Sequence, residues 1–311
     1  MRNGTDIKVF YLYAFAGMKF KNLYFALFLM IYLVTVIGNI LIIVLTKMDH
    51  RLQAPMYFLL RNLAFLDICY TATTVPQMLV NLIMEQLAIS LPACIIQLFV
   101  FLSLAASESS LLAAMAYDRY VAICNPLRYS VMMSKEVCLH MLSGTWVIGS
   151  VYGAIHTANT FRLPLCGSNI LNHYFCDIPP LLKISCIDTT PNEATVFALG
   201  GFLMLGCFLM IFRSYIQILI SVLSIPKGCG RMKGLSTCGS HFIVVMLFYG
   251  SGGLMYFRPK SKELTDKEWL LSLFYTSFTP LLNPLIYSLR NKDIQGAFQK
   301  YFKKYVMQRH F

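Results

Sequence analysis

The fold of this chain is decided by residues 115–127, which have the sequence MAYDRYVAICNPL. They follow an apolar run that begins near Cys94, contains one acid, Glu108, and is long enough to cross a bilayer. Asp118 and Arg119 then stand together where this run would reach water. A charged pair is tolerated at the membrane surface and is costly in the hydrocarbon interior. The stretch therefore indicates the end of a membrane-spanning helix.

The composition of the whole chain also indicates a membrane protein. Hydrophobic residues make up 57% of the 311 residues and charged residues only 13%, about half the charged share of an average soluble domain. The net charge of +12 does not predict a nucleic-acid partner, because the basic residues lie between apolar runs and at the C-terminus. The N-terminus lacks a short apolar core with a small-residue cleavage site, so we expect the first apolar segment to be an uncleaved signal anchor.

Seven apolar stretches predict an all-α membrane protein, a bundle of seven transmembrane helices. Each has about the 20 residues that a spanning helix needs. They are residues 23–45, 56–82, 94–123, 137–158, 194–223, 235–257 and 270–289. In residues 293–306, lysines and apolar residues alternate at helical spacing, which predicts a short amphipathic helix on membrane lipid. The chain is accordingly divided into an N-terminal segment (1–22), a seven-helix domain (23–290) and a C-terminal tail (291–311).

The lysines and arginines predict the orientation in the membrane. An odd number of spans places the two termini on opposite sides, and most of the 26 basic residues fall on the side of the C-terminus. The positive-inside rule therefore places the C-terminus in the cytoplasm. The sequon Asn3-Gly4-Thr5 agrees, because glycosylation of Asn3 requires an N-terminus outside the cytoplasm.

Four cysteines on the outer side predict disulfide bonds. They are Cys94 at the outer end of the third span and Cys166, Cys176 and Cys186 in the long loop 161–193. An even number of cysteines in an oxidising compartment favours bridges, and a bridge from Cys94 would hold the loop as a lid over the bundle. The alternative is metal binding, because His173 and Asp177 lie near Cys176, but the paired C-x-x-C spacing of structural zinc sites is absent.

Three ionisable residues, Asp67, Glu108 and His241, lie inside the predicted spans. Such groups are expensive in lipid and usually face the interior of a bundle. They indicate a polar cluster that binds an ion or a proton and changes between conformations. The alternative is a set of interhelical hydrogen bonds that only holds the bundle together.

A hinge is predicted in the seventh span. Pro280 and Pro284 free backbone carbonyls there, and the side chain of Asn283 is placed to bond them locally. Transporters also use broken helices, but no inverted repeat or second matching broken helix supports that class.

Taken in order, these motifs resemble those of the olfactory receptors, a branch of the rhodopsin-like G-protein-coupled receptors. The resemblance covers nearly the whole chain. Its motifs are Gly38-Asn39, PMYFL at 55–59 with Leu66-Asp67, residues 115–127, Ser214-Tyr215, KGLSTCGSH at 233–241 and PLLNPLIYSLRN at 280–291. The chain departs from the usual pattern at residues 10–13 and 17–18, which leaves the packing of the N-terminus open, and at Gly234-Leu235.

The resemblance implies roles for several positions. Arg119 would hold the receptor inactive through Asp118 and contact the G protein when released, and Tyr215 and Tyr287 would swing toward Arg119 on activation. The residues implied in switching and G-protein coupling are Asp118, Arg119, Tyr120, Tyr215, Lys233, Asn283, Pro284 and Tyr287. Those that match the polar switch cluster of the family are Asp67, Glu108 and His241, and Tyr249 matches its ligand-sensing aromatic position.

The resemblance also implies pairings and partners. Cys94 would pair with Cys176, and Cys166 with Cys186. The protein would be a plasma-membrane receptor and not an enzyme, and would need neither a cofactor nor a metal. A small odorant would activate it, and it would act on a stimulatory, olfactory-type heterotrimeric G protein that raises cyclic AMP.

The ligand is expected in the outer half of the bundle, under the lid. Helical spacing counted back from Arg119 gives the lining of the third span. The expected lining is Phe101, Leu102, Ala105, Ala106, Leu199, Phe202, Leu203, Tyr249, Gly252, Gly253, Tyr256, Leu273 and Thr276. It is apolar with a few hydroxyls, and it places no acid near Phe101 to pair with a cation. We therefore expect a small, neutral, mostly hydrophobic odorant that one or two hydrogen bonds orient.

Two other classes of protein are alternatives, a channel or transporter and a membrane enzyme. A channel should show a ring of charge or a filter loop. An enzyme needs paired catalytic groups at one membrane depth, which Asp67, Glu108 and His241 could imitate, but the chain offers them no partnered nucleophile.

Overall fold

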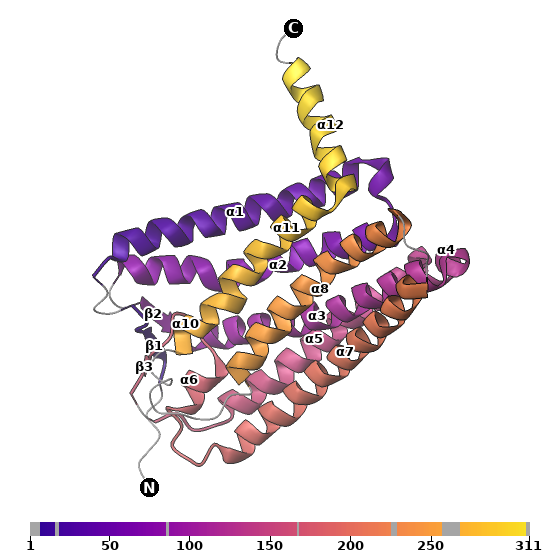
Figure 1. Ribbon diagram of the computed structural model, residues 1–311. Coiled ribbons are helices and arrows are strands. Elements are labelled where there is room, and N and C mark those ends of the chain that lie inside the picture. The colour runs from indigo at the N-terminus through magenta and orange to yellow at the C-terminus, as the bar shows by residue number, and fades with distance from the viewer. Residues whose placement is uncertain are drawn as a thin grey trace.

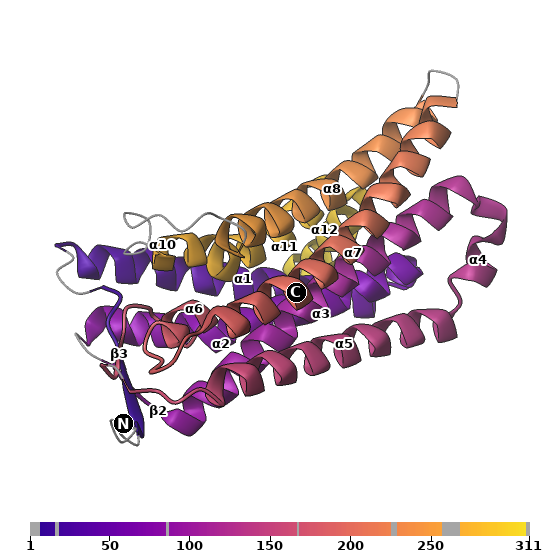
Figure 2. The same cartoon turned by 90° about the horizontal axis from the view of Figure 1, so that it is seen from below.

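The computed structural model describes residues 7–15, 19–84, 87–166, 168–224, 229–256 and 268–308. This part of the chain forms a bundle of seven long helical segments (Figures 1 and 2). They are α1 (Lys21–Met48), α2 (Pro55–Ile83), α3 (Leu91–Cys124), α5 (Lys135–Phe161), α7 (Thr190–Ser224), α8 (Cys229–Tyr256) and a seventh made of α10 (Glu268–Leu273), η3 (Phe274–Phe278) and α11 (Thr279–Arg290). Within the described residues, α1, α2, α3, α5 and α7 are long and apolar enough to cross a membrane. The predicted fold class is confirmed, with helix ends shifted by a few residues.

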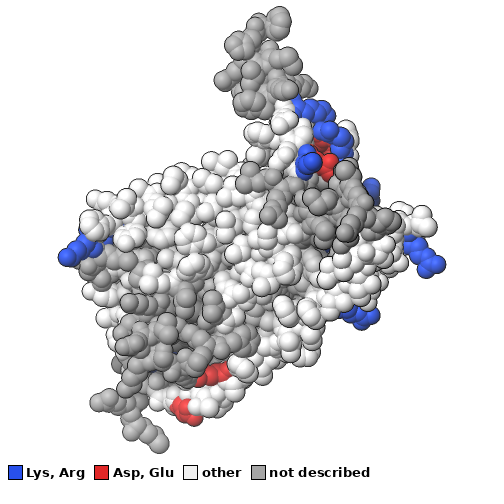
Figure 3. All heavy atoms as spheres, viewed as in Figure 1, with Lys and Arg blue, Asp and Glu red and all other residues white. Residues whose placement is uncertain are grey.

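Short elements connect the long helices. On the side of the C-terminus these are η1 (His50–Leu52), η2 (Pro126–Arg128), α4 (Tyr129–Met132) and α12 (Lys292–Gln308). On the other side are β1 (Val9–Leu12), β2 (Leu87–Ser90), β3 (Ile170–Leu171) and α6 (Ile178–Leu182). Figure 1 shows α12 turning away from the bundle, as expected of a helix that follows a membrane surface. In Figure 3 the charged side chains lie toward the ends of the bundle, and the described surface between them is uncharged.

Helix α3 lies at the centre of the bundle and packs against α2, α5, α7 and α8. Its contact with α5 is close because α5 has glycines there. A Cβ at Gly149 would collide with the Ser107 hydroxyl, and one at Gly153 with the Ser103 hydroxyl. Small residues let helix backbones approach in membranes, where dispersion forces replace the hydrophobic effect between helices.

The seventh helical segment is distorted before its first proline. Pro280 has no N–H to donate, and the Thr279 N–H bonds the carbonyl of Phe274, five residues back, so residues 274–278 form a π-helical turn. Pro284, by contrast, stays inside α11. The carbonyl of Pro280, which the missing N–H of Pro284 leaves free, accepts a 3.4 Å hydrogen bond from Asn39 of α1. The expected local bonding by Asn283 is therefore wrong, because Asn39 takes that role.

A three-stranded sheet, which the sequence did not predict, lies at the end of the bundle opposite α12. β1 is its central strand and pairs antiparallel with β2 and parallel with β3. Phe10 and Leu12 of β1 are fully buried, and Asn81 of α2 donates a 2.9 Å hydrogen bond to the carbonyl of Leu12. The N-terminal segment, whose packing the sequence left open, is thus part of the folded outer end.

Candidate functional site

A cavity of about 950 Å³ opens in the half of the bundle that carries the loop between α5 and α7. Its wall comes from α2, α3, α5, α6, α7, α8 and η3, together with the loop before α7. The inner wall is mostly apolar and includes Phe101, Leu203 and Phe248, whereas the charged side chains of the lining come from the loop side of the cavity. They are Lys183, Asp188 and Glu193. This size and polarity match pockets that bury small, largely apolar ligands.

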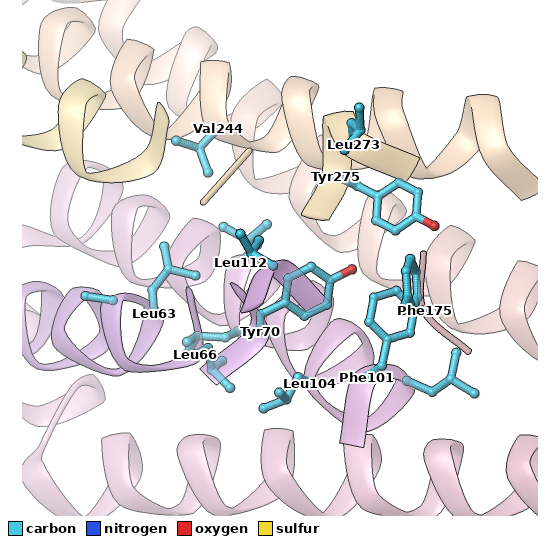
Figure 4. Close-up of a cluster of buried hydrophobic side chains, with 14 of the residues drawn as sticks. Leu63, Leu66, Tyr70, Phe101, Leu104, Leu112, Phe175, Val244, Leu273 and Tyr275 are labelled. Carbon is cyan, nitrogen blue, oxygen red and sulfur yellow. The ribbon is translucent and has the colours of Figure 1, made fainter. Parts of the chain in front are cut away.

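Aromatic rings form one end of the cavity around Phe101 of α3 (Figure 4). Its ring centroid lies 5.1 Å from that of Tyr70, 4.7 Å from that of Phe175 and 6.1 Å from that of Tyr275. These rings come from α2, α3, the long loop and η3. Offset and tilted ring contacts stabilise the fold beyond the effect of the apolar area that they bury. The cluster therefore joins the loop firmly to the helices.

The loop between α5 and α7 is held over the cavity as the predicted lid. Disulfide bonds join Cys94 to Cys176 and Cys166 to Cys186. The Tyr174 hydroxyl lies 2.8 Å from that of Thr276. The metal alternative loses its thiolate ligand, because the sulfur of Cys176 is bonded to Cys94.

The lid also inserts the side chain of His173 into the protein interior. Its side chain is fully buried, and its Nε2 lies 3.0 Å from the hydroxyl of Ser272 in α10. Burial lowers the pKa of His173 to about 3, and the nearby charge of Lys183 acts in the same direction. The imidazole is therefore neutral at physiological pH.

The structure places the expected lining residues as follows. Those that line the cavity are Phe101, Leu102, Ala105, Ala106, Leu203 and Gly252. Leu273 and Thr276 are buried but do not line it. Tyr249 lies behind the wall, with its hydroxyl 2.8 Å from that of Ser109. The side chain of Tyr256 lies outside the described residues.

The expectation for two residues of α7 is wrong. Leu199 is 39% exposed and Phe202 is 82% exposed, and both point out of the bundle. The cavity is lined instead by Gly200, Gly201 and Leu203. Since each residue turns a helix by about 100°, an error of one position in the phase of α7 is enough to exchange wall and outer surface.

The polar residues of the spans are buried, and Asn283 interacts with both Asp67 and Glu108. Asn283 donates to both carboxylate oxygens of Asp67 at 3.1 Å, and the Tyr215 hydroxyl lies 2.8 Å from Nδ1 of His241. Within the described residues, no hydrogen bond joins Asp67, Glu108 and His241 to one another. Some buried polar atoms of this region have no partner there, namely Glu108 Oε1, His241 Nε2, Asn283 Oδ1 and the Tyr287 hydroxyl.

The Asp-Arg pair lies at the end of α3 that faces α4. The Arg119 guanidinium is 3.2 Å from Asp118 Oδ2, and the Tyr129 hydroxyl donates a 2.8 Å hydrogen bond to Asp118 Oδ1. Burial and the charge of Asp118 raise the pKa of Tyr129, so this phenol stays a donor. Tyr120 packs beside the small apolar cluster of α7 around Ile218.

Other switch residues are placed as follows. The Tyr215 hydroxyl lies 2.8 Å from Nδ1 of His241, and Tyr287 is buried. The side chain of Lys233 and the whole of Asn3 lie outside the described residues, so the roles expected for them stay predictions.

Helix α12 is anchored to the connection between α1 and α2. The buried Asp49 carboxylate lies 2.8 Å from Arg51 and 3.7 Å from Lys300 of α12. Hydrogen bonds from Arg51 hold the pKa of Asp49 below its usual range. Tyr301 donates to the carbonyl of Met48 at 3.1 Å, and Tyr57 of α2 donates to Asp293 of α12 at 2.8 Å, so the tail helix is tied to the bundle at several points.

Sequence reasoning missed Tyr152 of α5 as a residue of the cavity wall. The spacing of small and polar residues along this span contained a signal. The buried face of α5 includes Thr145, Gly149, Gly153 and His156, and Tyr152 lies at the edge of that face. A hydroxyl at this edge can reach a cavity between α5 and α7.

The bundle with an outer cavity has the seven-helix fold of rhodopsin. The crystal structure of squid rhodopsin matches it with a TM-score of 0.69 at 20% sequence identity, over 92% of this chain and 87% of that chain. This likeness defines the class of fold.

Sequence comparisons define the family within this class. A sequence model described as olfactory receptor matches residues 28–305. Olfactory receptor 5M5 of Mus musculus is 45% identical over 93% of this chain and 91% of its own length. Olfactory receptor 9G4 of Homo sapiens is 47% identical over 96% of this chain and 91% of its own length. The chain belongs to the olfactory receptor family, and it is a multi-pass membrane receptor and not an enzyme.

Proposed function

We propose that this receptor binds a small, neutral, mostly hydrophobic odorant in the cavity and activates a stimulatory, olfactory-type G protein, raising cyclic AMP. The observation that carries the proposal is the cavity, with an apolar inner wall and charged residues only on its loop side. A charged ligand bound deep in this cavity would lack a counter-ion, which is a large desolvation penalty. A neutral ligand would instead bury its apolar surface against Phe101, Leu203 and Phe248.

The proposed orientation places the lid outside the cell and α12 in the cytoplasm. Both disulfides lie at the end of the bundle with the sheet, where an oxidising compartment would form them. Residues 1–22 would then be extracellular, residues 23–290 the receptor domain, and residues 291–311 the cytoplasmic tail. Ile294 and Ala297 of α12 face the protein, whereas Phe298 is 44% exposed and would enter membrane lipid.

Coupling is proposed at the end of α3 that would face the cytoplasm. Arg119 is held there by Asp118, which Tyr129 also bonds. Release of Arg119 from this pair would free a guanidinium for the G protein, and Tyr215 and Tyr287 would move toward it. The side chains of Asn283 and Pro284 would take part through α11.

The proposal is tested by cyclic AMP responses to an odorant panel in cells that express the receptor. Arg119→Ala should abolish the response at equal surface expression. Arg128→Ala is the matched control, because Arg128 is an exposed arginine of the same end and should leave the response unchanged. A full response in Arg119→Ala would contradict the role of Arg119, and an ion current in place of cyclic AMP would favour a channel.

A further inference from the structure

Most hydrogen-bonding side chains of the cavity wall already have partners in the protein. The Ser109 hydroxyl is paired with that of Tyr249, and Tyr275 donates to Asp177 and Ser272. On the loop side the pairs are Thr189 with Glu193, Thr190 with Asp188, and Ser185 with the carbonyl of Ile187. The hydroxyl of Tyr152 also belongs to the wall, and the described residues provide it with no hydrogen-bond partner.

The ring of Tyr152 is held in place from behind. Its centroid lies 4.3 Å from that of His156, one turn further along α5, and His156 is fully buried. Gly149 and Gly153 press this part of α5 against α3. The phenol therefore projects from a fixed surface, which favours a directional contact over an adaptable one.

The hydroxyl points across the cavity wall toward α7. A Cβ added at Gly200 would lie 3.1 Å from the Tyr152 oxygen, closer than an unstrained contact. The absence of a side chain at Gly200 thus provides room for the Tyr152 hydroxyl. A side chain at position 200 would push it aside.

We infer that Tyr152 orients the ligand by donating a hydrogen bond to an acceptor oxygen, and that Gly200 keeps this donor accessible. The inference rests on the proposed function and names its ligand class: neutral ketones, aldehydes, esters or ethers with an apolar remainder. A phenol is a better donor than acceptor, because its ring withdraws the oxygen lone pairs. A ligand with an acceptor and no donor leaves none of its own N–H or O–H groups unpaired in the apolar wall.

The test uses matched pairs of neutral volatiles, each an oxygen-bearing compound and the hydrocarbon of the same skeleton, in linear, cyclic and aromatic series. Binding is measured by the ligand-dependent shift in melting temperature of purified receptor, and signalling by cyclic AMP in cells. Tyr152→Phe removes only the hydroxyl. Tyr32→Phe in α1 is the matched control, because Tyr32 is a half-buried tyrosine outside the cavity wall.

We expect Tyr152→Phe to weaken oxygen-bearing ligands about tenfold, the effect of one neutral hydrogen bond, and to leave hydrocarbons unchanged. Gly200→Ala should weaken the same ligands, but it should have little further effect when Tyr152→Phe is already present, because both act on one contact. Tyr32→Phe should behave as wild type.

Two results would overturn the inference. One is that no oxygen-bearing compound shifts the melting temperature of the wild type. The other is that Tyr152→Phe weakens the binding of an oxygen-bearing compound and of its matched hydrocarbon equally. A thermal shift that depends on Tyr152, without a cyclic AMP response, would uphold the inference and refute the proposed coupling. The two proposals are thus separated by their readouts.

Discussion

The two ends of the bundle are stabilised in different ways. At the outer end, two disulfides, a small sheet and hydrogen bonds from His173 and Tyr174 fix the lid in one arrangement. In the interior around Glu108 and His241, several buried polar atoms lack partners among the described residues. Buried polar atoms without a partner also occur toward the end with the sheet, for example Asn81 Oδ1, but there the two disulfides hold the lid in place, whereas in the interior unused donors and acceptors can gain bonds on rearrangement. This difference supports the proposal that switching takes place in the polar interior.

The largest expected effect comes from opening the outer end. Cys176→Ser removes the bridge to Cys94, and we expect it to reduce stability by about 2–5 kcal/mol and to abolish surface expression. Cys69→Ser, which replaces a free cysteine of α2, should express almost normally. Surface staining and thermal unfolding measure both. Equal behaviour of the two variants would show that the lid does not depend on its covalent tie.

A smaller effect is expected in the interior. Asn283→Ala removes the donor that bonds both oxygens of Asp67, and leaves a fully buried carboxyl group without that partner. We expect a loss of about 1–3 kcal/mol in stability, measured by thermal unfolding in detergent. Asn62→Ala is the control, because Asn62 bonds only the carbonyl of Phe58 in its own helix and should cost less than about 0.5 kcal/mol. Equal losses of stability in the two variants would show that the bond to Asp67 contributes no more than a bond within one helix.

The smallest effect concerns pH and the lid. The pKa of His173 is about 3 in the folded protein and about 6.5, its ordinary value, in the unfolded chain. Below pH 6.5, His173 therefore binds a proton in the unfolded chain but not in the folded protein. Stability should therefore fall by about 1 kcal/mol between pH 7 and pH 5.5. His173→Gln, which keeps a donor for Ser272 but does not titrate, should lack this part of the pH dependence.

Thermal unfolding at the two pH values measures the effect of His173. His140→Gln is the matched control, because His140 is exposed on α5, and it should retain the pH dependence of the wild type. If His173→Gln also retained that dependence, burial of His173 would not be its cause.

The sequence predicted those features that depend on local pattern. Long apolar runs with charges at their ends specified the helices within a few residues, because the bilayer sets their length. The burial of Asp67, Glu108 and His241 followed in the same way from the high energy of such groups in lipid. The pairing of Asp67 with Asn283 could not be predicted, since it depends on how α2 and α11 are rotated.

The missed features depend on contacts between distant segments. Strand β1 has no partner until Ser90 and Ile170 are brought beside it, so the sequence alone did not indicate a strand at residues 9–12. The π-helical turn before Pro280 arises from hydrogen bonds that a count of prolines does not reveal. Leu199 and Phe202 were misplaced because the apolar α7 has no polar face to fix its phase.

The seam between α3 and α5 has a mechanical consequence. With no Cβ at Gly149 or Gly153, the two backbones are in direct contact, since a Cβ at either position would collide with the hydroxyl of Ser107 or Ser103. These two helices would stay fixed relative to each other, and Tyr152 belongs to this fixed part. If this close contact keeps α3 and α5 together, we expect a bound ligand to displace the opposite wall, α7 and α8, where Tyr215 and His241 join the two helices. The receptor would then respond to the size of a ligand, because one wall of the cavity stays fixed and the other moves.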